Sequence, residues 1–221
     1  MMRRRVVVGA GAAVVIAVAM ATGWLLRATV GTVAAESSPS PSAVEIAYMQ
    51  DMVAHHQQAV VMAKSIDREG IDPGVRLLAR QISESQQYEL GTMIGRLRMA
   101  GQPVENPEPM AWMPGTDQMS GMSDHHPGDH HGGGHDMPGM ATTEQLTQLG
   151  SLSGTAAENL FLELMYRHHQ GGIAMAQTAL PLVTTAAVRE SVLDTVNGQT
   201  KEVGLMGSML AERDAQAPAP G

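Results

Sequence analysis

The sequence contains no cysteine, which excludes disulfide bonds and thiolate metal sites. Aromatic residues make up only 3% of the chain, and strand-like runs of Val, Ile, Tyr and Phe are absent beyond the N-terminal region, which disfavours a β-rich fold. Without the four N-terminal arginines, 10 basic residues remain against 22 acidic ones. This balance argues against nucleic acid as a partner and suits a surface that attracts cations. Methionine and histidine, in contrast, are abundant, with 18 and 9 residues.

The N-terminus has the pattern of an export signal. Three arginines at positions 3 to 5 precede an uncharged stretch at residues 6–26, which is long enough to span a bilayer. A small-residue sequence that ends at Ala35 could still be cleaved, so residues 1–35 are either a signal peptide or a transmembrane anchor. We favour an uncleaved anchor, followed by a short linker at residues 36–41. In both cases the rest of the chain is expected outside the cytoplasm.

Two segments of the chain repeat at a constant offset of 113 positions. Residues 48–63 read YMQDMVAHHQQAVVMA, and residues 161–176 read FLELMYRHHQGGIAMA. A second shared motif, Q-x-x-E-hydrophobic-x-x-M, stands at residues 86–93 and 199–206. Self-similarity of this kind indicates a duplicated structural unit.

Each copy predicts two helices joined by a short loop. The helix-start signals are capping boxes at Ser42–Glu45 and Thr155–Glu158, and N-cap candidates at Asp72, before Pro73, and at Thr185. We expect helices at residues 43–66, 73–99, 156–180 and 186–211, and a short helix at residues 143–152. One hairpin cannot bury its apolar face alone, so the two antiparallel hairpins (42–100 and 143–211) should form an all-α four-helix bundle. A disordered tail should follow at residues 212–221.

The first helix of each copy places one methionine flanked by two histidines on the face that looks into the bundle, at about 100° per residue. These residues are Met52, His55 and His56 in the first copy and Met165, His168 and His169 in the second. The opposite face of the first copy carries Gln50, Ala54, Gln58 and Ser65. We therefore expect the four histidines to meet inside the bundle and to bind a metal, with the two methionines nearby.

The second helix of each copy supplies polar partners, Gln86 and Glu89 in the first copy and Gln199 and Glu202 in the second. Folding the hairpin should bring Gln86 level with Met52 and Glu89 within about a turn of His55. Because a buried carboxylate is costly unless it is paired, we expect these residues to accept hydrogen bonds from the histidines and fix their tautomers. The glutamates could instead bind a metal harder than Cu(I). A hydrogen-bonded core network without metal remains the alternative, since repeats preserve packing too.

Residues 101–142 form a Gly- and Pro-rich linker that cannot form a regular helix. It carries methionines as three Met-x-x-Met pairs, together with five histidines: Met110, Met113, Met119, Met122, Met137, Met140, His125, His126, His130, His131 and His135. Such tracts are typical of metal binding. Thioethers select Cu(I) and imidazoles suit Cu(II), Zn and Ni, so copper is the expected metal and other transition metals remain open.

Both copies resemble the "domain of unknown function" family numbered 305. Its motif M-x-x-H-H-x-x-A-x-x-M-A stands at residues 52–63, and at residues 165–176 with Gly172 in place of the usual Ala. The resemblance implies a ferritin-like four-helix fold, and some members resemble periplasmic copper-binding proteins, which implies copper handling. The sequence has no Glu-x-x-His motif, which argues against a di-iron oxidase.

Three functions follow as hypotheses. The first is an extracytoplasmic protein that sequesters or delivers copper without turnover, and so is not an enzyme. The second is a helical metallo-oxidoreductase that uses Glu89 and Glu202 as acid/base groups; no phosphate loop, nucleophile elbow or zinc-protease motif supports an enzyme of another class. The third is a structural, membrane-tethered bundle without metal. The expected partners are a metal ion and, through an uncleaved N-terminus, the membrane; a protein partner is not identified.

Overall fold

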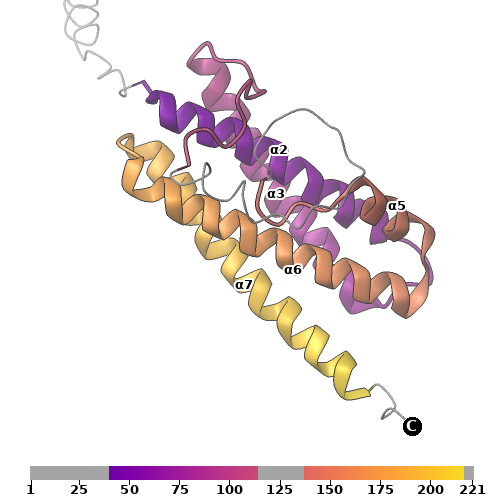
Figure 1. The fold of residues 1–221 in the computed structure, drawn as a ribbon. Helices are drawn as coiled ribbons and strands as arrows, with labels where there is room; N and C mark the ends of the chain where they lie inside the picture. Colours follow the sequence, from indigo (N-terminus) through magenta and orange to yellow (C-terminus); the bar gives the residue numbers. More distant parts are fainter. Residues whose placement is uncertain (1–39, 114–136, 217–221) are drawn as a thin grey trace, which may run out of the picture. The chain divides into compact units, whose positions relative to one another are not determined.

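The computed structural model describes residues 40–113 and 137–216, and within these residues the chain forms helices and no strand. In chain order the elements are α2 (Ala43–Ile66), α3 (Pro73–Met99), α5 (Thr143–Ser151), α6 (Gly154–Ala179), the 3-10 turn η1 (Leu180–Leu182) and α7 (Ala186–Gln216). Figure 1 shows α2 beside α3 and α6 beside α7, and α2 also packs against α6. The predicted all-α bundle of two antiparallel hairpins is confirmed, as is the short helix before the second hairpin.

The predicted start signals of the first hairpin are confirmed. The Ser42 hydroxyl accepts the backbone N–H of Glu45, and the Glu45 carboxylate accepts the N–H of Ser42, which completes the capping box of α2. Asp72 caps α3 by accepting two backbone N–H bonds, and Pro73 is the first residue of the helix. Both helices have the predicted bounds.

The capping box predicted at Thr155 and Glu158 is wrong. Helix α6 begins earlier, at Gly154, and the side chain of the preceding Ser153 makes no capping bond. The Glu158 carboxylate instead accepts a hydrogen bond from Arg213 in the last turns of α7 (2.9 Å). Its oxygens are therefore used between helices and not within α6.

Two glutamates join the hairpins at their ends. Glu45 accepts the backbone N–H groups of Thr184 (2.9 Å) and Thr185 (2.6 Å), directly before α7. In the equivalent contact, Glu158 accepts the backbone N–H of Asp72 (2.8 Å), directly before α3. Because the start of α2 thus lies near the end of α6, these two helices run antiparallel.

Helix α7 continues to Gln216, past the predicted end at residue 211. The ion pair between Arg213 and Glu158 holds this part of α7 against α6. The prediction of a disordered tail is therefore wrong for residues 212–216, while residues 217–221 lie outside the described part of the chain.

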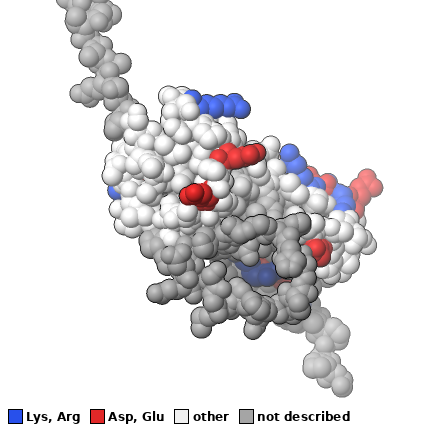
Figure 2. All heavy atoms as spheres, turned by 45° about the horizontal axis from the view of Figure 1, so that its top comes forward, with Lys and Arg blue, Asp and Glu red and all other residues white. Residues whose placement is uncertain are grey.

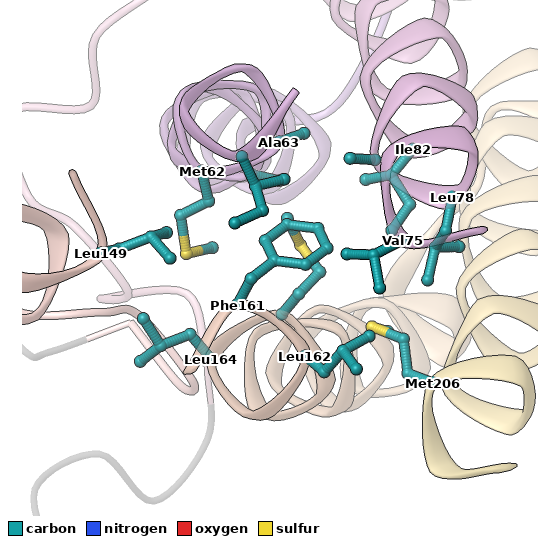
Figure 3. Close-up of a cluster of buried hydrophobic side chains, with 14 of the residues drawn as sticks. Met62, Ala63, Val75, Leu78, Ile82, Leu149, Phe161, Leu162, Leu164 and Met206 are labelled. Atoms are coloured by element: carbon teal, nitrogen blue, oxygen red, sulfur yellow. The ribbon is translucent and has the colours of Figure 1, made fainter. Parts of the chain in front are cut away.

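The core consists of two hydrophobic clusters, and each takes side chains from both hairpins. One contains the end of α2 and the starts of α3 and α6; Figure 3 shows Met62, Ile82 and Phe161 converging there from these helices. The other contains the start of α2 and the ends of α3 and α6, with Tyr48 and Leu97 fully buried. The histidine motifs lie between the two clusters along α2 and α6.

None of the helices in the described residues is long and apolar enough to cross a membrane. The predicted signal or anchor segment lies in residues 1–39, outside the described part. On the face drawn in Figure 2, single acidic and basic side chains lie among uncharged ones, and no extended basic patch is seen on it.

Candidate metal centre

The four histidines of the repeated motif are fully buried in one layer between α2 and α6. His55, His56, His168 and His169 each have 0% exposed surface. The rings of His55 and His168 stack with their centroids 3.7 Å apart and their planes at 36°. The antiparallel run of α2 and α6 explains this contact, because it brings equivalent positions of the two copies face to face. The prediction that all four histidines point inward is confirmed.

Each outer histidine is paired with a glutamate from the second helix of its own hairpin. His56 Nε2 donates to Glu89 Oε2 (2.8 Å), and His169 Nε2 donates to Glu202 Oε2 (2.6 Å). The sequence predicted Glu89 within about a turn of His55, and the structure pairs it with the adjacent residue, His56, on the side of α2 that faces α3. Because a carboxylate only accepts, Nε2 is the donor in both bonds, and Nδ1 of each imidazole is buried without a hydrogen-bond partner.

The two glutamates are also held from the opposite hairpin. Thr195 Oγ1 donates to Glu89 Oε2 (2.6 Å), and Ser85 Oγ lies 3.1 Å from Glu202 Oε1. Burial by itself would raise the pKa of Glu89, but the hydrogen bonds from His56 and Thr195 outweigh burial, and the pKa is lowered. Glu89 is therefore ionised at neutral pH and acts as an acceptor for His56.

The stacked pair differs from the outer histidines because neither member contacts a carboxylate. His55 Nε2 donates to the backbone carbonyl of Pro138 (3.0 Å). Burial, together with the neighbouring His56, lowers the pKa of His55 to about 3. Burial and the nearby histidines also hold the pKa of His168 well below its usual range; the His55 backbone raises it slightly, without a hydrogen bond of normal geometry. Both rings are therefore neutral at pH 7 and available as ligands.

The four histidines and the second helices of the two hairpins hold most of the unpaired buried polar atoms in the described chain. Five of these eleven atoms belong to the histidines, namely Nδ1 of all four and Nε2 of His168, and three belong to Gln86 on α3 (Oε1) and Gln199 on α7 (both amide atoms). A buried polar atom without a partner costs about 1–3 kcal/mol. These atoms are therefore the buried donors and acceptors that no other part of the described chain uses.

The atom types around the histidine layer are those that bind soft transition metals. Imidazole nitrogens line the layer, and the thioethers of Met52 and Met165 lie one helical turn before the stacked histidines, fully buried. Among the described residues, however, no three His, Asp or Glu side chains converge closely enough to hold a metal ion together. The described residues therefore do not present a ready-made four-histidine cage.

The methionines at the two ends of the predicted linker pack against the bundle. Met110 is 1% exposed and lies in the second hydrophobic cluster, which Met113 and Met137 also contact, while Met140 is partly buried. Met110 thus serves the core in this structure. The other predicted linker ligands lie outside the described residues: Met119, Met122, His125, His126, His130, His131 and His135.

Sequence reasoning missed the residues that hold the linker ends. Buried Asp51 accepts hydrogen bonds from the Met110 N–H, the Trp112 indole and the Asn106 amide, and burial raises its pKa against these three bonds. Gln58 binds both backbone groups of Ala141. A signal was present in the repeat, because Asp51 and Gln58 correspond to an apolar residue and a glycine in the second copy.

The fold and the two His–Glu pairs define a duplicated helical hairpin with a buried histidine layer. The family described as "Domain of unknown function (DUF305)" matches residues 45–210, and the chain belongs to this family. This confirms the resemblance found in the sequence motifs.

Solved structures share the fold. A DUF305 protein from Streptomyces coelicolor, described as secreted, is 34% identical, with a TM-score of 0.64 over 77% of this chain and 92% of that one. A DUF305 fragment from Deinococcus radiodurans is 28% identical, with a TM-score of 0.62 over 79% and 99%. CopM in its Cu(II)-bound form is 22% identical, with a TM-score of 0.56 over 76% and 96%, a likeness of fold. No curated protein sequence matches the chain.

Proposed function

We propose that this protein is an extracytoplasmic copper-binding protein that holds or passes on the metal without turnover. The observation that carries the proposal is the layer of unpaired imidazole and amide atoms, buried between two hydrophobic clusters. A purely structural network would be expected to pair these atoms with one another. In the proposed site the Nδ1 atoms of the histidines bind the metal, with the thioethers of Met52 and Met165.

Copper is favoured over a harder metal by the donors themselves. The layer combines imidazole nitrogen with thioether sulfur, and Glu89 and Glu202 are already engaged by histidines. CopM, which shares the fold, has been crystallised with Cu(II), Cu(I) and silver bound. The export-like N-terminus and the relative from Streptomyces coelicolor that is described as secreted support a location outside the cytoplasm.

The test separates the bundle from the linker. In a linker-silent variant, the methionines and histidines between positions 114 and 136 are replaced by serine at unchanged chain length, so that both packed linker ends are kept. Equilibrium dialysis against Cu(I), Cu(II) and Zn(II) should show that this variant retains copper. Changing His55 and His168 to Ala in the same background should abolish both the binding and the stabilisation by metal.

Two results would contradict the bundle site. One is a linker-silent variant that takes up no metal, which would leave only the linker as a site. The other is a double histidine variant that loses equal stability with and without copper, as a hydrogen-bonded network requires. The absence of turnover is tested by an oxidase assay on the copper-loaded protein, which should match free copper at equal concentration.

A further inference from the structure

One short segment makes the two halves of the histidine layer unequal. Residues 137–141, here called the strap, end the linker and lie across α2 and α6. The Pro138 carbonyl accepts the Nε2–H of His55 (3.0 Å), while the equivalent His168 has no hydrogen bond of normal geometry at either ring nitrogen. The duplicated sequence predicts equal environments, and the strap removes that equality.

The repeat has diverged at the positions that hold the strap. The Gln58 amide donates to the Ala141 carbonyl (2.9 Å) and accepts the Ala141 N–H (2.7 Å). The side chain thus makes the same pair of hydrogen bonds with the strap that a residue of a paired β-strand would make. The equivalent position on α6 is Gly171, where a Cβ would fall on the Pro138 carbonyl oxygen. Gly139, in the strap, has φ +79° and lies so close to the α6 backbone that a Cβ would collide with it. The two glycines allow the strap to lie close to α6, and Gln58 fixes which strap residue lies opposite it on α2.

The other paired histidines show what the strap carbonyl does. His56 and His169 donate Nε2–H to a glutamate, which holds each ring in one orientation and leaves Nδ1 buried without a partner. Metal-binding histidines commonly donate their second N–H to a carboxylate or a backbone carbonyl in this way. His55 has no glutamate, and the Pro138 carbonyl is its only acceptor in the described chain.

We propose that the strap is the orienting group for His55 as a metal ligand, and that Gln58 and Gly171 are positioning residues that hold it there. His168, which makes no such contact with the strap, is then the ligand whose tautomer the strap does not fix. This inference rests on the proposed function, because it assigns roles within the same copper site.

The metal-free protein tests the orientation. Long-range ¹H–¹⁵N spectra should show His55 as the Nε2–H tautomer with a slowly exchanging proton, and His168 without a fixed proton. Gln58→Ala should speed exchange at His55 and leave His56 unchanged, and Gln58→Glu, which keeps the acceptor for Ala141, should lie between. Gln57→Ala, an exposed neighbour on α2, is the matched control and should change nothing. Identical behaviour of His55 and His168, or a His55 signal that ignores Gln58→Ala, overturns the proposal.

Copper affinity tests the consequence. In the linker-silent background, Gln58→Ala should weaken binding by about ten-fold or more, as loss of an orienting partner does elsewhere, while Gln57→Ala should not. Equal affinities for the two variants overturn the positioning role and leave the proposed function standing. A linker-silent parent that binds no copper overturns the proposed function and the ligand roles together, whatever the spectra of the metal-free protein show.

Discussion

The first hairpin, α2 with α3, and the second, α6 with α7, carry equivalent residues in the shared histidine layer and different residues where the linker packs. The layer keeps His-His and Q-x-x-E in both copies, and both histidine–glutamate bonds form. On α2, Asp51 and Gln58 bind the two ends of the linker, whereas α6 has Leu164 and Gly171 at these positions. Divergence is therefore found where the two hairpins meet the linker in different ways, α2 through polar side chains and α6 through a glycine, which explains how a duplicated scaffold acquires an asymmetric site.

The largest effect is expected from separating the two hairpins. A chain of residues 40–113 alone should lose cooperative folding, because both hydrophobic clusters take side chains from both hairpins and half a core buries too little apolar surface. Urea unfolding by circular dichroism and size-exclusion chromatography should show a molten or self-associated species. Mixing in residues 137–216 at equal concentration is the control and should restore a cooperative transition. A monomeric first half that unfolds cooperatively by itself would contradict the interdependence.

Acid should weaken the fold through the stacked pair. Burial lowers the pKa of His55 to about 3 and holds that of His168 well below the usual 6.5. Below pH 6.5 the unfolded chain therefore binds protons that the folded chain does not. The free energy of unfolding is therefore highest above pH 6.5. It falls by about 1 kcal/mol per pH unit for each of the two histidines as the pH drops from 6.5 toward their pKa in the folded protein.

Urea titrations of metal-free protein between about pH 7 and pH 5 measure this slope and stay above the range in which the glutamates titrate. The double variant His55→Gln/His168→Gln should have a much flatter dependence. If wild type and double variant lose stability in parallel, the buried pair is not the source of the acid sensitivity.

Asp51→Leu copies the second hairpin into the first and should destabilise the protein by about 3 kcal/mol, because it leaves buried donors of the linker without an acceptor. The donors are the Met110 N–H, the Trp112 indole and the Asn106 amide. The free energy of unfolding in urea is the measurement. Glu163→Leu, an exposed change beside Leu164 on α6, is the control and should stay within about 0.5 kcal/mol of wild type. A loss of similar size in both variants would show that the leucine and not the missing acceptor is responsible.

Local signals were enough to predict most of the fold. Ser42 with Glu45 and Asp72 with Pro73 fixed the helix starts, and the constant repeat offset predicted the pairing of hairpins. Where prediction failed, a contact between distant segments decided the structure: Arg213 and Asp72 draw Glu158 away from a capping box.

The candidate site was predictable in composition and not in its contacts. Helical periodicity places both His55 and His56 on the inner face of α2. The two side chains differ by about 100° around the helix axis, and the periodicity does not say which of them faces Glu89. Gln58, predicted on an outer face, is covered by the strap, because periodicity contains no information about a linker that folds back onto a helix.

The smallest difference in the free energy of unfolding is expected between alanine variants of two adjacent glycines on α6. Replacing a helical glycine with alanine normally stabilises a helix by about 1 kcal/mol, and both Gly171 and Gly172 would gain this. At Gly172 the nearest atoms to a new Cβ belong to the amide end of Gln199, which is a flexible side chain. Gly172→Ala should therefore have a free energy of unfolding within about 1 kcal/mol of wild type, and the first copy has alanine, Ala59, at the equivalent position.

At Gly171 the Cβ would meet the Pro138 carbonyl, so the strap must move away from α6 and His55 loses its acceptor. Gly171→Ala should therefore be less stable than Gly172→Ala by about 2 kcal/mol in urea unfolding. Equal free energies of unfolding for the two variants would mean that the contact between the strap and Gly171 does not stabilise the protein. The difference between the two hairpins at this position would then have no effect on stability.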